Sequence, residues 1–232
     1  MNDFKLTKEW IQKAKDKDAC QEAIEWLEEK ERTWFELKNK GSWWAAWGMI
    51  NIKDIPIDLD GLNSGSRAWV MIERPDCPID LTGLDPFNRA WVMIARPDCQ
   101  IDLTGLNLRD RVRVMVRRPD CPIDLTGLDL VDRIEAMVKR HDCPIDLTGL
   151  SSYGRSLVMA KRPDCPIDLT DLSSWDRSSV MIARPDCPID LKGLDSWDRA
   201  RVIINRPDCQ IDLDDLSQED HIWMLEMRGK NE

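Results

Sequence analysis

Thiols, carboxylates and guanidinium groups recur along this chain at one fixed spacing. Cys77, Cys99 and Cys121 are 22 residues apart, and the same step continues to Cys209. Each cysteine lies in a nearly constant stretch, such as RPDCPIDLTGLD at 74–85. Thiolates and carboxylates are common ligands of zinc, calcium and iron–sulphur clusters, and paired thiols form disulfides. The repeated residues therefore either perform such chemistry or build a surface.

The spacing of the cysteines argues against both a metal site and disulfides. Equivalent residues of stacked helices are expected ~8–10 Å apart, whereas a disulfide needs Cα atoms within about 7 Å. No two cysteines have the CxxC spacing that is typical of zinc sites. A degenerate copy begins near Ser42, and there Ile55 occupies the cysteine position, which a metal ligand would not allow. We therefore expect buried core thiols in a reducing compartment.

Two columns of aspartates follow the same period. The first, with Asp76 and Asp98, precedes a predicted short helix, which its carboxylates would cap. The second, with Asp80 and Asp102, lies inside that helix and is expected to form a ladder of ion pairs rather than a row of calcium ligands, because the DxDxDG spacing is absent. The candidate partners are Arg89, Arg111 and Arg133 in one column and Arg74, Arg96 and Arg118 in another.

Catalytic constellations are absent from the sequence. His141 occupies a proline position of the repeat and His221 lies near the end of the chain, and these are the only histidines. We find no Ser/His/Asp or Cys/His arrangement and no glycine-rich phosphate loop. The methionine at one position of most copies is expected to fill the core. The sequence therefore predicts a protein that is not an enzyme and that has no catalytic, cofactor-binding or metal-binding residues.

Each copy is predicted to contain one α-helix of about ten residues. Asp85 is a typical N-cap and Pro86 suits the first helical position, so a helix is expected over 87–95. Pro97 ends this helix, because proline lacks a backbone N–H and restricts the residue before it.

A second, short 3₁₀ helix is predicted at 99–103, with Asp98 as its cap and Gly105 in a left-handed conformation at its exit. The alternative is a leucine-rich repeat in which Ile-Asp-Leu forms a strand. The aspartate within that strand, the proline just before it and the helical character of the preceding segment argue against this alternative.

The complete pattern resembles the leucine-rich variant repeat, which alternates an α-helix with a short 3₁₀ helix in a HEAT-like superhelix. It reads VMIERPDCPIDLTGLD at 70–85, and the resemblance covers about 42–216. It implies an all-α fold, a right-handed α-solenoid of 22-residue repeats. Some members of that family carry an N-terminal iron–sulphur module, but this chain has only Cys20 in its N-terminal segment, so that feature is not carried over.

Three segments are predicted: a helical N-terminal cap at 1–41, an array of about eight repeats at 42–216, and a C-terminal capping helix at 217–232. In the cap, Thr7 and Asp18 are candidate N-caps, and Asp18 with Gln21 has the spacing of a capping box. The cap also resembles the opening of short phage and bacterial proteins of unknown function. The chain starts without an apolar signal segment and has no apolar run that could span a membrane, so a cytoplasmic location is expected.

One face of the predicted helices varies completely between copies. Positions 87, 91 and 95 are four residues apart and therefore line one side of their helix. A column that accepts tryptophan, arginine and glutamate must face solvent, and exposed tryptophan and arginine are typical of protein interfaces. The candidate partner-binding residues are Trp47, Trp69, Phe87, Trp91, Arg109, Arg113, Arg117, Tyr153, Trp175 and Trp197.

Two functions remain open at this point, and a third, a DNA-binding solenoid, rests only on the arginine cluster around Arg109. The favoured one is a non-enzymatic scaffold that binds a protein partner through the variable face. The alternative is an acidic inhibitor that mimics DNA and occupies the nucleic-acid site of a host protein, which the net charge of −10 and the regular aspartates suggest. That charge disfavours binding to nucleic acid or to an anionic membrane. The tryptophans at 47, 69 and 91 could instead pack on the N-terminal cap.

Overall fold

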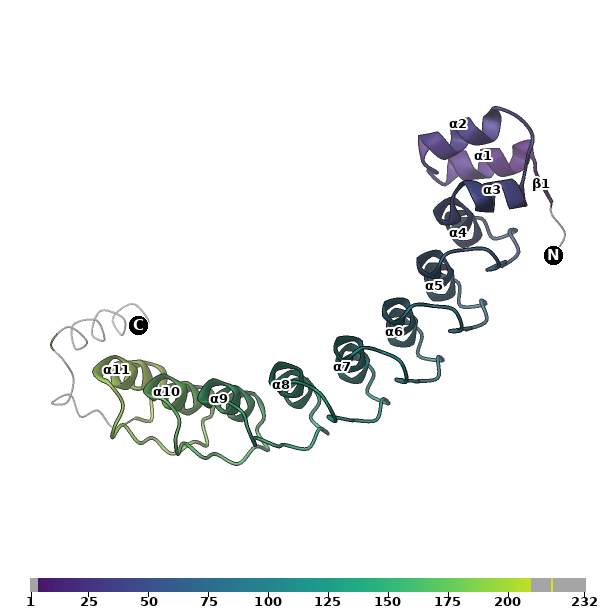
Figure 1. The fold of residues 1–232 in the computed structure, drawn as a ribbon. Helices are drawn as coiled ribbons and strands as arrows, with labels where there is room; N and C mark the ends of the chain where they lie inside the picture. Colours follow the sequence, from purple (N-terminus) through teal and green to yellow (C-terminus); the bar gives the residue numbers. More distant parts are fainter. Residues whose placement is uncertain (1–3, 210–217, 219–232) are drawn as a thin grey trace. The chain divides into compact units, whose positions relative to one another are not determined.

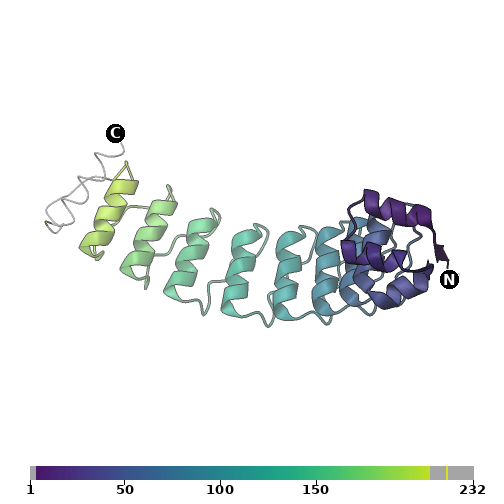
Figure 2. The same cartoon turned by 90° about the horizontal axis from the view of Figure 1, so that it is seen from above.

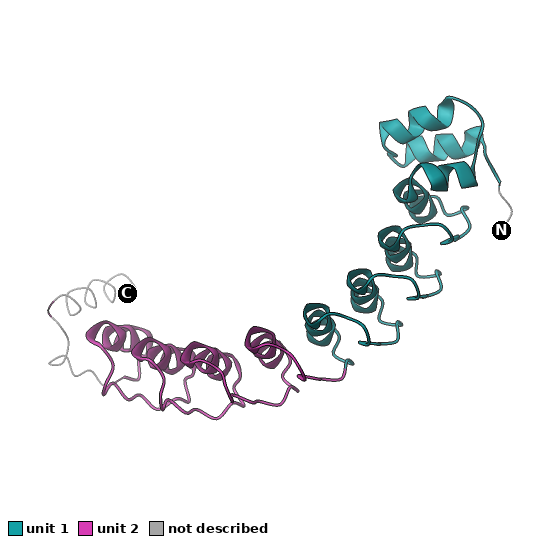
Figure 3. Cartoon of the chain, in the orientation of Figure 1, with its two compact units in different colours: residues 1–121 teal, residues 122–232 magenta. Residues whose placement is uncertain are grey.

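The chain is all-helical apart from one two-stranded pairing (Figure 1). The computed structural model describes residues 4–209 and 218. It divides into two compact units, 1–121 (unit 1) and 122–232 (unit 2), each described by itself below (Figure 3). Unit 1 contains β1 (Lys5–Leu6), α1 (Lys8–Asp16), α2 (Gln21–Glu28), β2 (Arg32–Thr33), α3 (Trp34–Lys40), α4 (Ser42–Asn51), α5 (Ser64–Glu73), α6 (Pro86–Ala95) and α7 (Leu108–Arg117). Unit 2 contains α8 (Leu130–Lys139), α9 (Ser152–Lys161), α10 (Ser174–Ala183) and α11 (Ser196–Asn205).

The N-terminal segment is helical, as its sequence predicts, and forms three helices; the short strands β1 and β2 pair antiparallel beside them. The predicted capping box at Asp18 is wrong, because Asp18 instead follows the end of α1 and has a φ of 56°. The N-cap of α2 is Cys20. The capping box of this segment lies at α3, where Thr33 and Glu36 each accept a hydrogen bond from the other's backbone N–H.

The repeat helices from α5 to α11 begin at a side-chain cap, whereas the N-cap of α4 is Gly41. At α6 the Asp85 carboxylate accepts a 2.9 Å hydrogen bond from the Asn88 backbone N–H, and Pro86 is the first helical residue, which confirms both predictions. The same bond forms at the other repeat helices from α5 to α11, where asparagine, aspartate or serine is the cap. Within each unit these helices lie side by side in a single layer, and the connecting segments lie along one side of it (Figures 1 and 2).

The predicted short 3₁₀ helix is wrong. Residues 97–107 contain two separate turns, with no regular secondary structure between them, and neither turn continues into a helix. The first is closed by a hydrogen bond from the Cys99 N–H to the Arg96 carbonyl, and the second by one from Leu106 to Leu103. Gly105 has a φ of 71°, so the predicted left-handed exit is confirmed. No strand forms at Ile-Asp-Leu in the described copies.

The core of each unit is built from the same columns. In α6, Val92 and Met93 are fully buried, and the nearby Cys99 is 3% exposed. Ile55 of the first copy is buried at the cysteine position, which confirms that this position belongs to the core. The methionine does more than fill space, because the Met93 Sδ accepts a hydrogen bond from the Asp102 backbone N–H at 3.3 Å.

A buried arginine joins each copy to the one before it. In unit 2, Arg162 follows the end of α9 and is 1% exposed. Its guanidinium donates hydrogen bonds to the carbonyls of Met137, Arg140, His141 and Cys143, at 2.6–3.1 Å. These carbonyls lie at and just beyond the C-terminal end of α8, where helix carbonyls lack intrahelical partners and positive charge is favoured. Arg96 and Arg118 in unit 1 and Arg184 and Arg206 in unit 2 are buried in the same way.

The first copy has no arginine at this position and has Ile52 instead. Asp54, which would pair with that arginine, forms an ion pair of 2.6 Å with Lys13 of α1. Asp58 likewise pairs at 2.7 Å with Lys38 of α3. Two lysines of the N-terminal segment thus replace the two arginine columns, and they attach this segment to the first copy.

None of the helices in the part of the chain that the structure describes has the length and apolar character needed to cross a membrane. The predicted C-terminal capping helix at 217–232 lies almost entirely outside the described residues.

Candidate functional site

The variable positions lie on the solvent-exposed side of the repeat helices. In α6 its residues Phe87, Trp91 and Ala95 are exposed, whereas Val92 and Met93 on the opposite side are fully buried. The helix period therefore places the variable positions in solvent, as their variability predicts. The predicted site residues fall into two groups, one in each unit.

The three tryptophans at 47, 69 and 91 have three different environments in unit 1. Trp47 lines a pocket that the N-terminal segment closes, so for this residue the prediction of packing against the cap holds. Trp69 is half-buried and stacks on Trp43, with ring centroids 4.0 Å apart and planes 7° apart. Trp91 is 40% exposed. Trp43 was not among the predicted site residues, although it occupies the variable position 44 residues before Phe87.

A second part of the unit 1 face combines aromatic rings with arginines. Phe87 is 56% exposed, and the Arg113 guanidinium lies 5.9 Å from its ring centroid. Phe87, Trp91, Arg113 and Arg117 line a surface hollow of about 230 Å³ between α6 and α7. Arg113 also forms an ion pair of 3.1 Å with the buried Asp110.

Arg109 and Arg117 are exposed and form no ion pair within residues 4–209 and 218. They lie eight residues apart on α7, with Arg113 between them, so three guanidinium groups follow one another over ~12 Å. In a chain with a net charge of −10, this is a local surface that favours anionic groups of a partner.

In unit 2 the face carries a layered aromatic group. Trp175 and Trp197 stack, with centroids 5.4 Å apart and planes 15° apart. The Arg201 guanidinium lies 3.7 Å from the Trp175 ring and 4.9 Å from the Trp197 ring, within the range of cation–π attraction. Tyr153 is 63% exposed on α9. Sequence reasoning missed Arg201, although it stands four residues after Trp197 on the same face.

Buried carboxylates hold these helices in position, and sequence reasoning also missed them. Asp198 is 2% exposed and accepts hydrogen bonds from Ser174 at 2.7 Å and Ser178 at 2.8 Å, both on α10. Asp176 accepts from Ser152 and Ser156 of α9 in the same way. These bonds link helices that carry Tyr153, Trp175 and Trp197. The sequence signal that could have revealed these bonds is that the serines of one copy recur 20 and 24 residues before the aspartate of the next copy.

Aspartates of both columns pair with arginine in most of the described copies, which confirms the predicted ion-pair ladder for those copies. Asp102 of the second column lies 3.2 Å from Arg89. The predicted capping role of the first column is wrong, because Asp98 instead binds the Arg96 side chain through both carboxylate oxygens, at 2.8 and 2.9 Å. This guanidinium lowers the pKa of the Asp98 carboxyl group. Many of the repeated aspartate carboxylates are therefore neutralised by an arginine of the same chain.

The repeated cysteines are buried thiols. In unit 2, Cys143 and Cys187 are each 2% exposed, and desolvation raises the pKa of both. A raised pKa keeps a thiol protonated, and the protonated form is a weak nucleophile and a poor metal ligand. Among the residues that the structure describes, no group of three or more His, Cys, Asp or Glu side chains could hold a metal ion.

Comparisons of the chain with family models, with curated proteins and with solved structures found no match.

Proposed function

We propose that the chain is a non-enzymatic scaffold that binds a protein partner through its variable helix face. The observation that carries this proposal is the exposure of Phe87, Tyr153, Trp175 and Trp197, whose side chains are 44–63% accessible. Buried columns on the same helices hold these residues in place. Aromatic and arginine side chains supply much of the binding energy of protein interfaces. The proposal agrees with the resemblance to leucine-rich variant repeats, which is itself an expectation.

The unpaired arginines of α7 suggest the chemistry of the partner. Arg109 and Arg117 offer two charged donors that no described carboxylate occupies, beside the exposed rings of Phe87 and Trp91. A partner segment with carboxylates and at least one apolar side chain would match this surface. Nucleic acid fits less well, because three guanidinium groups would neutralise few phosphates and the chain is acidic overall.

An acidic DNA mimic is less well supported than a scaffold. Such a mimic must present carboxylates that are free to meet the basic site of the inhibited protein. Here Asp98 and Asp102 in unit 1, and Asp146 and Asp164 in unit 2, already lie within 3.2 Å of an arginine. The pairing cancels much of the field that the mimic would need.

The test is photo-crosslinking in cells of the source organism. A photoreactive amino acid is placed at Phe87 or at Tyr153 on the variable face, and as controls at Gln100 or Thr104, which are exposed on the connecting segments of unit 1. We expect the same protein to be crosslinked from the variable face, and no such adduct from the control positions. Equal crosslinking from the variable face and from the control positions, or no crosslinking from the variable face, would refute the proposal.

A matched variant then tests the residues themselves. We expect the double substitution Phe87→Ser with Arg117→Ala to abolish the adduct formed from Tyr153, while the unfolding midpoint changes little, because both side chains are exposed. The control substitutions Gln100→Ser and Thr104→Ala should leave the adduct unchanged. Trp69→Ala is a less clean variant, because Trp69 is half-buried and stacks on Trp43.

A further inference from the structure

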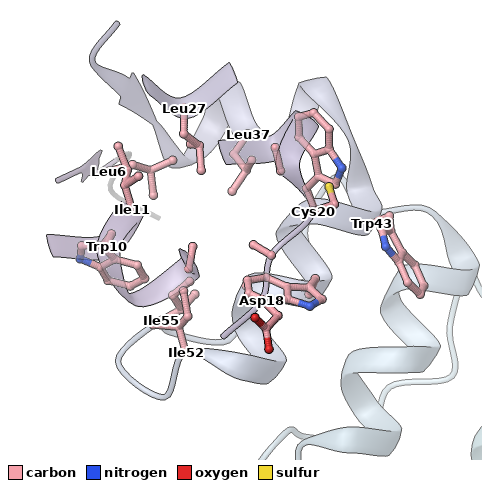
Figure 4. A pocket seen from close by; sticks show the side chains of 16 residues that line it. Leu6, Trp10, Ile11, Asp18, Cys20, Leu27, Leu37, Trp43, Ile52 and Ile55 are labelled. Carbon is pink, nitrogen blue, oxygen red and sulfur yellow. The ribbon is translucent and has the colours of Figure 1, made fainter. Parts of the chain in front are cut away.

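An apolar pocket of about 260 Å³ lies between the N-terminal segment and the first copy of the repeat, within unit 1 (Figure 4). Buried aliphatic side chains form its interior, whereas three of its lining residues, Asp18, Cys20 and Trp43, are exposed and mark its mouth. The interior includes Leu6, Leu27, Leu37, Ile52 and Ile55.

The replacements that are specific to the first copy make this pocket apolar. Ile52 stands where the later copies have the buried arginine, and Ile55 stands where they have cysteine. The pocket walls come from β1, α1, α2, α3 and α4 and from the segments after α1 and α4. A concave and mostly apolar site with few polar groups is typical of the binding of small molecules.

Four indoles line the pocket, those of Trp10, Trp43, Trp44 and Trp47. The face of an indole attracts cations, and more strongly where water is partly excluded. The chain itself uses this attraction nearby, because the Lys40 ammonium lies 5.9 Å from the Trp44 ring centroid. The lining therefore suits an apolar body together with a positive charge.

Asp18 at the mouth supplies the matching negative charge. Its φ of 56° is a left-handed conformation that glycine or asparagine adopts at lower cost. It also follows the C-terminal end of α1, where the helix dipole disfavours a carboxylate. No described cation pairs with it, since Lys13 binds Glu9 and Asp54, and Lys15 binds Glu28. Asp171 has the same left-handed conformation, with a φ of 57°, so the backbone of Asp18 is not itself a sign of a ligand. The sign is that an exposed carboxylate without a described cationic partner lines the pocket.

We propose that this pocket binds a small molecule with an apolar body and one amine. The apolar body lies among the aliphatic side chains of the interior, and the ammonium group lies at the mouth, between the Asp18 carboxylate and the Trp43 indole. This site is separate from the hollow at Phe87 and Arg117, and the proposal does not depend on the function proposed above.

Three ligands with one body and different head groups test the proposal on the full chain. They are 4-phenylbutylamine, 4-phenylbutanol and 4-phenylbutyrate, titrated by calorimetry and by the fluorescence of the indoles. We expect the amine to bind tightest and the carboxylate weakest. The ratio between amine and alcohol should be up to about fivefold, the range of a single partly exposed ion pair, and it should shrink as salt is added.

Asp18→Asn is the decisive variant, because asparagine keeps the size of the side chain and tolerates the left-handed conformation. We expect it to fold with an unchanged or higher melting temperature, to keep the affinity for the alcohol, and to lose most of the preference for the amine. The preference that remains is the attraction of the indoles for the ammonium group. Asp16→Asn is the matched control, since Asp16 lies in the same turn and accepts a hydrogen bond from Gln12. That variant should keep the preference for the amine.

Three results would overturn the proposal: no binding of any of the three ligands, equal affinities for amine and carboxylate, or an undiminished preference for the amine in Asp18→Asn. The last result would show that Asp18 does not hold the amine.

Discussion

The Arg162 guanidinium contacts four backbone carbonyls of the preceding copy and the carboxylate of Asp164. A planar group with five donors can satisfy this set of acceptors, whereas the lysine ammonium is a compact charge with three donors. Hydrogen bonds from arginine side chains to backbone carbonyls thus link neighbouring copies, in addition to the apolar contacts of the core. The arginine column was recognised in the sequence only as a possible partner for aspartate.

We expect Arg162→Ala to lower the free energy of unfolding by ~3 kcal/mol or more, because it leaves buried carbonyls without donors. Arg162→Lys should recover only part of this loss. Chemical denaturation monitored by circular dichroism measures both values. Arg117→Ala is the control, since this arginine is exposed and should change stability by less than ~0.5 kcal/mol. Equal losses for the two alanine variants would contradict the role assigned to Arg162.

The carboxylates paired with these arginines predict sensitivity to acid. The hydrogen bond from Arg162 lowers the pKa of Asp164 from its ordinary value of 3.8 to about 2. A lowered pKa in the folded state means that the stabilisation is complete above pH ~4 and is lost as the pH falls towards ~2. Asp98, Asp142 and Asp186 are shifted in the same direction by their own arginines.

Thermal unfolding followed at several pH values between ~5 and ~2 tests this linkage. We expect the melting temperature to fall across this window, and to fall less steeply in Asp164→Asn, which cannot titrate at this position. A profile that is identical in the variant and the parent chain would show that Asp164 does not contribute.

The repeat helix was predictable because its signals are local. An N-cap, a proline and a period of apolar residues lie within a dozen positions, so Asp85 and Pro86 mark the start of α6 correctly. The connecting segment was not predictable in the same way. Asp98 has the local signature of a cap, but its carboxylate is held by Arg96 two residues earlier, and no helix forms beyond Cys99.

The contacts that join copies were missed because they are not local. Arg162 binds carbonyls 19–25 residues earlier in the chain, and Asp198 binds serines 20 and 24 residues earlier. Such contacts show in a sequence only as two polar columns offset by about one period. The variable face could be predicted for the opposite reason, since variation from copy to copy marks exposure directly.

The turn at 126–127 depends on a local feature, the glycine at position 127. Gly127 has a φ of 74°, and a Cβ atom at this position would meet no other atom within 4 Å. Conformation rather than space therefore opposes a side chain. We expect Gly127→Val to cost at least ~1 kcal/mol in unfolding free energy, and Gly127→Asn to cost less, because asparagine tolerates positive φ. Equal stability of the valine variant would contradict the turn assignment.

At the scale of the whole molecule, the constant period means that complete copies are interchangeable. We expect deletion of residues 86–107, which is one 22-residue copy, to leave a cooperative helical protein, because Arg118 would then meet the carbonyl of Met71 that Arg96 contacts now. Deletion of the 11 residues 86–96 removes α6 and leaves its connecting segment, so we expect it to disrupt unit 1. Far-ultraviolet circular dichroism and thermal unfolding of the two deletions distinguish these outcomes.

The direction of the arginine contacts has a consequence for synthesis of the protein. The ends of repeat helices such as α4, α5 and α8 are completed by an arginine that lies later in the chain; Arg162, which follows α9, completes the end of α8. A copy that has just left the ribosome therefore has unsatisfied carbonyls until the next arginine emerges. Folding should follow translation with a lag of about one copy. The first arginine of the column, Arg74, contacts the carbonyl of Met49 in α4, so we expect the array to become stable only from this residue onwards.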